Sequence, residues 1–470
     1  VFDEFFMFLM SVRLLKEKKS DLESTYVMKR SQESERLKAS LPYSLTKAQE
    51  KVLGEVYADL SGGQVMNRLI QGDVGSGKTI IAILALLQAA ENGFQGALMV
   101  PTEVLARQHL ESIEELFAAH GIEKKAVLLT GSMTAKEKRL AYRQIENHEA
   151  DIIVGTHALI QEKVVYDKLA LVITDEQHRF GVSQREMLGK KGEEPHVLVM
   201  SATPIPRTLG LLMFGDLDIS VLDELPPGRT PVKTYAITGK KRADMYGFVR
   251  RQLAAGRQAY IVCPVIDEGE NDMQAVTTYY TDVAQPLLEH YRVGLMHGRL
   301  KAAEKAAVMD AFKAGALDVL VSTTVIEVGV DVPNANIIVI ENAERYGLSA
   351  LHQLRGRVGR GKGEAYCVLI SDHATDAVKK RLSFLCHTND GFEIAKFDLE
   401  TRGPGDFFGS RQHGLPTLRI ADLMADSRAL YAAQKEALAL VGADPALRSP
   451  GNAGLRRLAE ELFSGDTALN

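Results

Sequence analysis

A glycine-rich segment in the first quarter of the chain has the residue types and spacing of a phosphate-binding loop. It reads Gly72-Asp73-Val74-Gly75-Ser76-Gly77-Lys78-Thr79. The glycines allow backbone N–H groups to curl around phosphate oxygens, and the helix expected over residues 80–90 adds its positive dipole end. We expect all of these residues to contact ATP, with Lys78 at the β- and γ-phosphates and the Thr79 hydroxyl on Mg²⁺. A chance glycine-rich turn is the alternative.

Two carboxylates follow a buried apolar run further along the chain. Asp175 and Glu176 come directly after residues 169–174, where the carboxyl end of a parallel strand opens onto the ligand crevice of an α/β sheet. We predict that Asp175 holds Mg²⁺ and that Glu176 polarises the attacking water as general base. Gln177 and His178 would couple the γ-phosphate to a second unit. An isolated acidic pair often only ends a strand, and a lone histidine is often simply packed.

A cluster of arginines occupies residues 352–361 (HQLRGRVGRG). Arginines delivered to a γ-phosphate are worth roughly 10³–10⁵ in the rate of NTPases. We therefore predict catalytic roles for Arg357 and Arg360, with Gln353 beside them. A solvated basic surface is the alternative interpretation.

The elements that must position these residues form two similar sets. Short Val/Ile/Leu runs alternate with helical stretches, which is typical of parallel strands buried on both faces. The runs are 68–71, 97–100, 127–129, 152–154, 169–174 and 197–200, and then 258–265, 293–296, 319–321, 337–340 and 365–370. Residues 223–232, with three prolines and a glycine, predict a linker between the sets. The fold class is α/β, with two tandem parallel sheets flanked by helices and a small, mainly helical C-terminal region.

Composition constrains the class of protein only loosely. The chain has 470 residues and a formal net charge of −5, so any DNA-binding surface must be a local concentration of positive charge. Its three cysteines are scattered, which disfavours a zinc site or a disulfide framework and indicates a reducing, cytoplasmic compartment. No apolar run approaches the roughly 18 residues that span a membrane. The start lacks an initiator Met and a basic signal region, and we expect a fragment.

In this order the motifs resemble those of superfamily 2 helicases over roughly residues 41–415. Gln49, in the segment 46–49, is similar to the adenine-binding Q motif, and Asp331 ends a segment similar to motif V. Segments similar to motifs Ia, Ib, III and VI are 101–106, 155–157, 201–203 and 352–361. The resemblance implies two RecA-like lobes of P-loop NTPase type. It implies domains at 1–40 (linker helices), 41–225 (ATP-binding lobe), 226–385 (second lobe) and 386–470 (helical region).

Further segments resemble the RecG and Mfd branch of these helicases. They are DEQHRFGVSQR (175–185), SATPIPRTL (201–209) and DLETRGPGDFFGSRQHG (398–414). The last is similar to the TRG motif, which couples lobe motion to movement on duplex DNA, and its form is closer to RecG than to Mfd. Glycines there permit a bendable loop, and the resemblance implies coupling roles for Arg402, Arg411 and Gln412. RecG proteins also carry an N-terminal wedge, and this chain begins after it.

The resemblance also implies which residues grip DNA. They are Thr102, Arg107, Thr156, His157, Ser201, Thr203 and Thr323. Contacts of this kind go mainly to phosphates, which position the protein without specifying sequence. The expected partner is branched or duplex DNA, with single-stranded-DNA-binding protein implied at the level of the family, and the expected state is a monomer near the bacterial nucleoid.

These observations favour one function over three alternatives. The leading hypothesis is an ATP-dependent DNA translocase of recombination and repair, which reverses stalled forks and branch-migrates junctions. The alternatives are a transcription-repair translocase like Mfd, a nucleotide-gated DNA-binding scaffold with little turnover, and a P-loop kinase or small-molecule ATPase. An RNA helicase is disfavoured by the TRG-like segment, and a zinc-bearing helicase by the cysteines.

Overall fold

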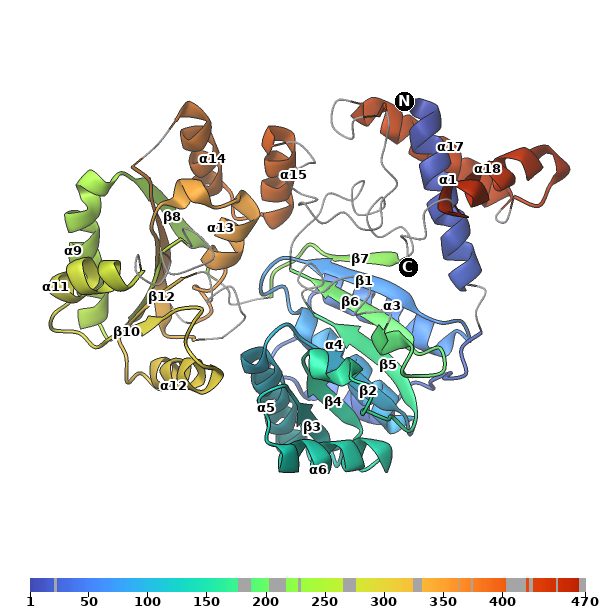
Figure 1. The fold of residues 1–470 in the computed structure, drawn as a ribbon, viewed down its shortest axis with the longest axis horizontal. Helices are drawn as coiled ribbons and strands as arrows, with labels where there is room; N and C mark the ends of the chain where they lie inside the picture. The colour runs from blue at the N-terminus through green and yellow to red at the C-terminus, as the bar shows by residue number, and fades with distance from the viewer. Residues whose placement is uncertain are drawn as a thin grey trace. The chain divides into compact units, whose positions relative to one another are not determined.

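The computed structural model describes most of the chain, in two compact units. The described residues are 1–20, 23–175, 187–202, 217–226, 230–264, 276–323, 332–361, 363–372, 375–402, 420–421, 426–444 and 447–464. The first unit, whose residues mainly contact one another, comprises residues 1–72, 76–224 and 399–470. The second unit comprises residues 73–75 and 225–398 (Figure 1). Several site residues expected from the sequence lie outside the described residues, namely Glu176, Gln177, His178, Thr203, Asp331, Arg411 and Gln412.

The first unit contains a seven-stranded sheet in the order β3-β4-β2-β5-β6-β1-β7, and every pairing between its strands is parallel. The strands are β1 (Asn67–Gly72), β2 (Gln95–Met99), β3 (Ala126–Leu129), β4 (Ile152–Gly155), β5 (Leu169–Thr174), β6 (His196–Ser201) and β7 (Asp218–Leu222). Strands β2, β4 and β5 are buried at every residue, which explains why their sequences are mainly apolar. The expected parallel sheet is confirmed.

Helices cover this sheet. They are α2 (Gln32–Ser40), α3 (Lys47–Ser61), α4 (Lys78–Glu91), α5 (Glu103–His120), α6 (Ala135–Glu146) and the 3₁₀ segment η1 (His157–Ile160). Helix α4 is buried along almost its whole length because nearly every residue after its first turn is apolar. Helices α3 and α6 both begin with a capping box, in which a threonine and the Gln or Glu three residues later satisfy each other's backbone N–H groups.

The second unit contains a six-stranded parallel sheet in the order β10-β11-β9-β12-β13-β8. Its strands are β8 (Val232–Ile237), β9 (Gln258–Val262), β10 (Val293–Met296), β11 (Val319–Ser322), β12 (Ala335–Ile340) and β13 (Ala365–Ile370). Its helical segments are η3 (Gly239–Lys241), α9 (Arg242–Ala254), η4 (Tyr280–Ala284), α11 (Gln285–Leu287), α12 (Ala302–Lys313), η6 (Ala343–Arg345), α13 (Leu348–Arg355), α14 (Asp376–His387) and α15 (Gly391–Arg402). One apolar cluster lies on each face of this sheet.

The two sheets repeat one local arrangement, in which a buried glutamine at the start of a strand closes the connection after a helix. In the first unit, Gln95 Nε2 donates to the carbonyl oxygens of Ile145 (2.8 Å) and Ala150 (2.9 Å). The equivalent contacts of the second unit run from Gln258 Nε2 to the carbonyl oxygens of Phe312 (2.6 Å) and Leu317 (2.7 Å). The similarity of the tandem units thus extends to individual polar contacts.

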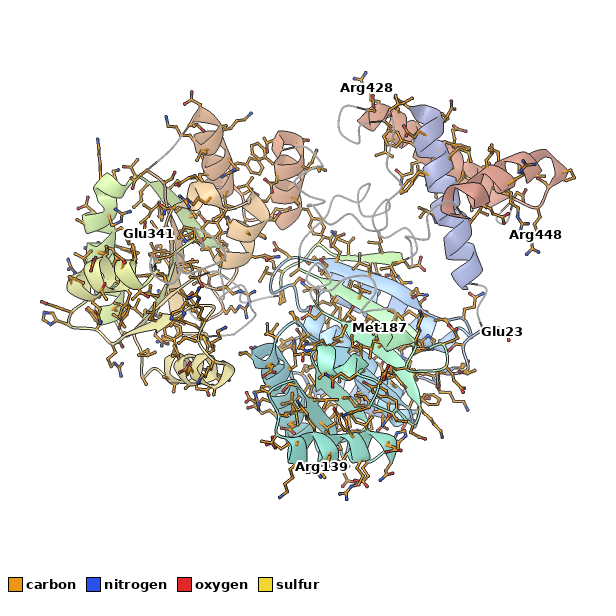
Figure 2. All side chains as sticks on the ribbon, viewed as in Figure 1. Glu23, Arg139, Met187, Glu341, Arg428 and Arg448 are labelled. Carbon is orange, nitrogen blue, oxygen red and sulfur yellow. The ribbon has the colours of Figure 1, made fainter. Side chains whose placement is uncertain are left out.

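A buried ion pair lies at the carboxyl end of β12. Glu341 is 3% exposed and accepts two hydrogen bonds from Arg242, at 3.1 and 2.8 Å, and one from the Tyr279 hydroxyl at 2.7 Å. The hydrogen bonds to Glu341 raise the pKa of Arg242, which keeps its guanidinium charged. Figure 2 contrasts this internal carboxylate with Arg139, which projects from α6 into solvent. The buried charge is therefore fully partnered and fixes the end of the strand.

Three helices near the chain ends pack together as a small bundle within the first unit. They are α1 (Phe2–Ser20), α17 (Ser427–Ala443) and α18 (Ala453–Ser464), and the short segment η7 (Pro450–Asn452) precedes α18. Their shared core includes Phe5, Phe8, Met10 and Leu430. The apolar residues of the N-terminal helix α1 are therefore buried against helices from the other end of the sequence (Figure 1). Among the described helices, none has the length and apolarity to cross a bilayer.

A buried histidine joins the first sheet to the extended segment before α2. His196 Nδ1 accepts the N–H of Met66 (3.0 Å), so Nε2 carries the proton and donates to the carbonyl oxygen of Tyr26 (2.9 Å). Ser24 Oγ lies 3.2 Å from the same Nε2. Burial lowers the pKa of His196, because a charged imidazole would lose its hydration. The neutral ring is therefore part of the folded arrangement.

This contact predicts a loss of stability in acid. Above a pH of about 6.5, the pKa of a histidine in an unfolded chain, His196 is neutral in both the folded and the unfolded state. Its full contribution to the free energy of unfolding is present at these pH values. As the pH falls below that value the unfolded chain binds a proton that the folded ring resists, so the free energy of unfolding falls by at most about 1.4 kcal/mol per pH unit. Urea unfolding at several pH values should show a weaker pH dependence for His196→Gln. The exposed His290→Gln should behave as wild type, and equal slopes for wild type and His196→Gln would contradict the account.

Candidate nucleotide-binding and nucleic-acid site

The predicted phosphate loop joins β1 to α4. Gly75 and Gly77 have φ values of 74° and 84°, in the left-handed region that favours glycine. A Cβ at Gly72 would lie 2.6 Å from Ser76 Oγ and 2.8 Å from the Leu222 side chain. The close approach at Gly72 and the positive φ of Gly75 and Gly77 explain why glycine occupies these three positions. The backbone can therefore turn tightly enough to surround a phosphate.

The side chains of the loop are arranged around its interior. Lys78, the first residue of α4, is 8% exposed, and its Nζ donates to the carbonyl oxygen of Gly72 at 2.8 Å. Ser76 Oγ is buried and makes no hydrogen bond within the described chain. Both features are typical of a loop that binds phosphate oxygens: Lys78 lies across the loop, and the buried hydroxyl of Ser76 lacks a hydrogen-bond partner within the described chain. Thr79 follows in the first turn of α4 and is half-buried.

Gln49 supports the phosphate loop from α3. It is 1% exposed, and its Nε2 donates to the carbonyl oxygen of Ser76 at 2.9 Å. Its Oε1 accepts the N–H of Thr46 at 2.8 Å as part of the capping box of α3. Both atoms of the carboxamide are therefore engaged within the protein. Contact of Gln49 with adenine remains a prediction, and the structure adds a positioning role for it.

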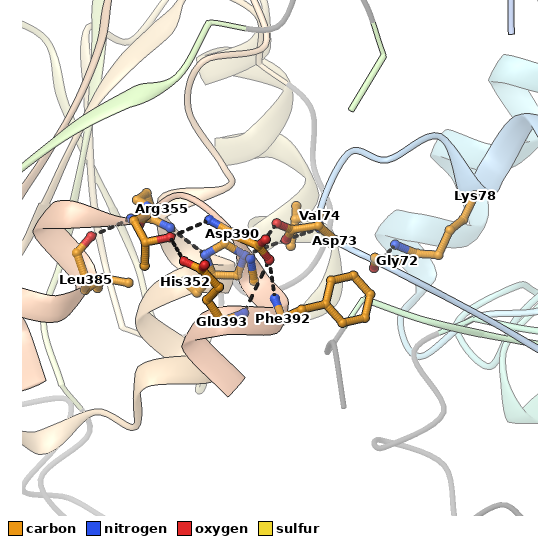
Figure 3. A network of polar contacts seen from close by, with 12 residues as sticks. Gly72, Asp73, Val74, Lys78, His352, Arg355, Leu385, Asp390, Phe392 and Glu393 are labelled. Carbon is orange, nitrogen blue, oxygen red and sulfur yellow. Dashed lines mark hydrogen bonds and ion pairs between the residues drawn. The ribbon is translucent and has the colours of Figure 1, made fainter. Parts of the chain in front are cut away.

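Asp73 and Val74 group with the second unit by their contacts, and Figure 3 shows the polar network around Asp73. Asp73 Oδ2 accepts the N–H of Gly391 (3.2 Å), and Oδ1 is hydrogen-bonded to His352 Nε2. Because the Arg355 guanidinium donates to His352 Nδ1 (2.7 Å), the ring proton lies on Nε2 and points at the carboxylate. This network was not foreseen from the sequence.

The arginines of residues 352–361 are not equivalent. Arg355 is 2% exposed and donates to the carbonyl oxygens of Leu385 (2.7 Å) and Thr388 (2.9 Å), which ties α13 to the end of α14. Arg360 is half-buried and its Nε donates to the carbonyl oxygen of Gly356 at 3.3 Å. The other two predicted catalytic side chains, Gln353 (8% exposed) and Arg357 (5% exposed), are buried. The contacts of Arg355 therefore hold the second unit together.

Asp175 follows β5 at the carboxyl edge of the first sheet. Its N–H donates to the carbonyl oxygen of Met99 (2.9 Å), and its carboxylate Oδ2 lies 3.7 Å from His109 Nε2. Among the described residues no group of three or more His, Cys, Asp or Glu side chains could hold a metal ion. Mg²⁺ that arrives with a nucleotide needs only one or two protein oxygens beside the phosphates. The Asp175 carboxylate and the Thr79 hydroxyl would supply oxygens of that kind.

The predicted DNA contacts divide into two groups by exposure. Arg107 and His157 are exposed, and Thr102 is half-buried as the N-cap of α5. Three others are buried, namely Thr156 (3% exposed), Ser201 (3%) and Thr323 (4%). The backbone N–H groups of Thr156 and Thr323 pair with neighbouring strands. Among the described members of this set, Arg107, His157 and Thr102 are the ones whose side chains are exposed or half-buried.

Family models match three successive parts of the chain. A DEAD/DEAH box helicase model matches residues 46–211, and a helicase conserved C-terminal domain model matches residues 241–362. A model described as ATP-dependent DNA helicase RecG, domain 3, C-terminal, matches residues 388–465. The three models together cover the phosphate loop, the arginine segment and the helical region.

Whole-chain comparisons give the same result. The ATP-dependent DNA helicase RecG of Bacillus subtilis is 47% identical over 460 residues, which is 97% of this chain and 67% of the relative. The protein of the same name from Synechocystis is 45% identical over 470 residues, covering 99% and 56%. A solved structure of RecG bound to a three-way DNA junction is 44% identical with a TM-score of 0.74, covering 92% of this chain and 56% of that chain. The chain thus spans roughly 56–67% of the length of these relatives.

Proposed function

Because this chain belongs to the RecG family of ATP-dependent DNA helicases, we propose that it is an ATP-driven translocase that moves along duplex DNA and remodels branched DNA, such as stalled forks and four-way junctions. The match of residues 388–465 to a RecG-specific domain carries this proposal, because that domain follows two parallel-sheet units, the first of which has a phosphate loop. The solved relative bound to a three-way junction supports branched DNA as the substrate class.

Hydrolysis of ATP, bound with Mg²⁺, would supply the free energy for movement. In our proposal Lys78 neutralises charge on the phosphates, and Thr79 and Asp175 supply oxygens to the metal ion. Arg357 and Arg360, with Gln353, stabilise the charge that develops on the transferred phosphoryl group. Glu176 would activate the attacking water, Gln177 and His178 would sense the γ-phosphate, and Asp331 would contact the nucleotide. The contacts of Lys78 and the buried Ser76 hydroxyl support this assignment.

DNA would be held mainly through its phosphates. We propose Thr102, Arg107 and His157 as the first contacts, because they are the exposed or half-buried members of the predicted set. The buried Thr156, Ser201 and Thr323 would act after rearrangement or through the backbone, and Thr203 remains a predicted contact outside the described residues. Such binding releases counterions.

The affinity for duplex DNA is therefore expected to fall steeply with salt. The plot of log K against log salt concentration should have a slope of about −0.9 per neutralised phosphate. Fluorescence anisotropy with labelled duplexes of unrelated sequence should give the same slope for each. Replacing Arg107 by alanine should reduce the slope by about one phosphate, since it removes one cation. A flat salt dependence would contradict phosphate-dominated binding.

The coupling of hydrolysis to movement is proposed to depend on Arg402, Arg411 and Gln412. Arg402 is the last residue of α15. Arg402→Ala is expected to keep most DNA-stimulated hydrolysis while losing movement, because its proposed role is outside the chemical step. Displacement of a third strand from a triplex measures movement on duplex DNA directly. The exposed Arg428→Ala, from α17, is the matched control, and loss of both hydrolysis and displacement in Arg402→Ala would contradict coupling.

The triplex assay also separates the alternatives. ATP-dependent displacement of the third strand by the wild-type chain supports a translocase. A gated scaffold would bind DNA without displacement, and a small-molecule ATPase would hydrolyse ATP with no response to DNA. A translocase like Mfd would also displace the strand, but the match of residues 388–465 to a RecG domain favours the RecG assignment.

A further inference from the structure

A single histidine interrupts the apolar inner face of α5. The buried positions of this helix are Leu105, Ala106, His109, Ile113 and Phe117. His109 is 7% exposed, and its Nε2 makes no hydrogen bond within the described part of the chain. A buried polar atom without a hydrogen bond is energetically costly, so a site that keeps one calls for a physical reason.

The side chain of His109 faces the Asp175 carboxylate. Nε2 lies 3.7 Å from Oδ2, which is longer than a hydrogen bond. A movement of roughly 0.5–1 Å would bring the pair into hydrogen-bond range. The backbone of Asp175 is fixed separately, because its N–H donates to the carbonyl oxygen of Met99 at the end of β2. The His109 imidazole therefore faces a carboxylate whose backbone is already held by the sheet.

Helix α5 also carries candidate DNA contacts on its other surfaces. Thr102 is its N-cap, and Arg107 is exposed two residues before His109. The start of the helix is anchored by Glu103, whose Oε1 accepts the N–H of Ser132 at 2.8 Å. Helix α5 therefore presents Thr102 and Arg107 toward solvent and the imidazole of His109 toward the Asp175 carboxylate. A shift of the helix would change the distance between His109 and Asp175.

We propose that His109 is a positioning residue, which holds the Asp175 carboxylate in the orientation that binds Mg²⁺ and links that carboxylate to the DNA-facing helix α5. The proposal rests on the proposed function, since it takes Asp175 as a metal ligand. A histidine that merely fills the core would have no reason to leave a nitrogen unsatisfied on an otherwise apolar face. The geometry favours a role for that nitrogen.

The proposed role of His109 can be tested by measuring nucleotide binding in the absence of ATP hydrolysis. A fluorescent, non-hydrolysable ATP analogue would be titrated at several Mg²⁺ concentrations. His109→Leu keeps the volume and removes the donor, so we expect the Mg²⁺ concentration for half-maximal binding to rise about tenfold or more, as for a lost hydrogen bond to a charged group. His109→Gln restores an N–H donor and should recover most of the loss. Affinity for the analogue without Mg²⁺, and for DNA without nucleotide, should stay unchanged.

Ile113→Val, on the same buried face of α5, controls for packing. It should lower the melting temperature slightly, by removing one methylene, and leave the Mg²⁺ dependence unchanged. If His109→Leu resembles Ile113→Val, with lower stability and normal Mg²⁺ dependence, the histidine is structural and the proposal is wrong. If instead the wild-type chain binds the analogue with no Mg²⁺ dependence, the metal-ligand role of Asp175 fails first. The two failures are thus distinguishable.

Discussion

Replacing Lys78 by alanine is expected to reduce ATP turnover at least about 10²–10³-fold and to weaken nucleotide binding. The side chain is 8% exposed and lies across the phosphate loop, where its Nζ donates to the Gly72 carbonyl oxygen. In a site shielded from water, one fixed positive charge near the phosphates stabilises both the bound nucleotide and the charge that develops during transfer. Steady-state hydrolysis and equilibrium binding of a fluorescent ATP analogue measure the two effects separately.

The control for this variant is Lys51→Ala, an exposed lysine of α3 in the same unit. It should hydrolyse ATP at the wild-type rate. Because the methylene stem of Lys78 is buried, the melting temperature of Lys78→Ala should be recorded, and a folded variant is expected. Turnover within a few-fold of wild type in a folded Lys78→Ala protein would remove this lysine from the catalytic site.

Replacing Arg360 by alanine is expected to reduce turnover by roughly 10³–10⁵, the range found for arginines that stabilise a transferred phosphoryl group. Nucleotide binding should change far less, because the interaction strengthens mainly as charge develops in the transition state. Arg360→Lys should recover little, since an ammonium group lacks the planar fork of donors. Single-turnover hydrolysis with saturating ATP isolates the chemical step.

Arg355 provides a matched contrast within the same segment. It is almost fully buried and donates to the carbonyl oxygens of Leu385 and Thr388. Arg355→Ala should therefore destabilise the second unit by roughly 3–5 kcal/mol through unsatisfied buried groups. Arg360→Ala should leave the unfolding transition unchanged. If the two variants lose stability and activity in parallel, the distinction between a structural and a catalytic arginine is wrong.

The interior strands of both sheets and the edge strands β3 and β10 could be predicted from sequence, and the edge strands β7 and β8 could not. Strand β5 is buried on both faces, so its residues from Leu169 to Ile173 form an unbroken apolar run. Strands β7 and β8 contain exposed residues and polar side chains, which interrupt the apolar run. Strand β8 even begins at Val232, the last residue of the expected linker.

The residues of the candidate site could likewise be predicted only where they lie close together in the sequence. The phosphate loop has a local signature, because its glycines and Lys78 lie close together in the sequence, within residues 72–79. The contacts of His352 with Asp73 and of His109 with Asp175 join residues far apart in sequence, and only packing brings them together. The spacing of the buried residues of α5 predicts that His109 is buried. It does not predict that His109 lies beside Asp175. The burial of Thr156 and Thr323 likewise could not be seen from their motifs.

The most direct test of the central claim is the rate of ATP hydrolysis at fixed low salt without DNA and with single-stranded DNA, plain duplex, and three- and four-way junctions. A DNA-driven motor predicts strong stimulation by duplex or branched DNA, abolished in Lys78→Ala. Greater stimulation by junctions than by plain duplex would place branch recognition within these residues, whereas an equal response would place it elsewhere in RecG proteins. Hydrolysis that no DNA stimulates would contradict the claim that this chain is a DNA translocase.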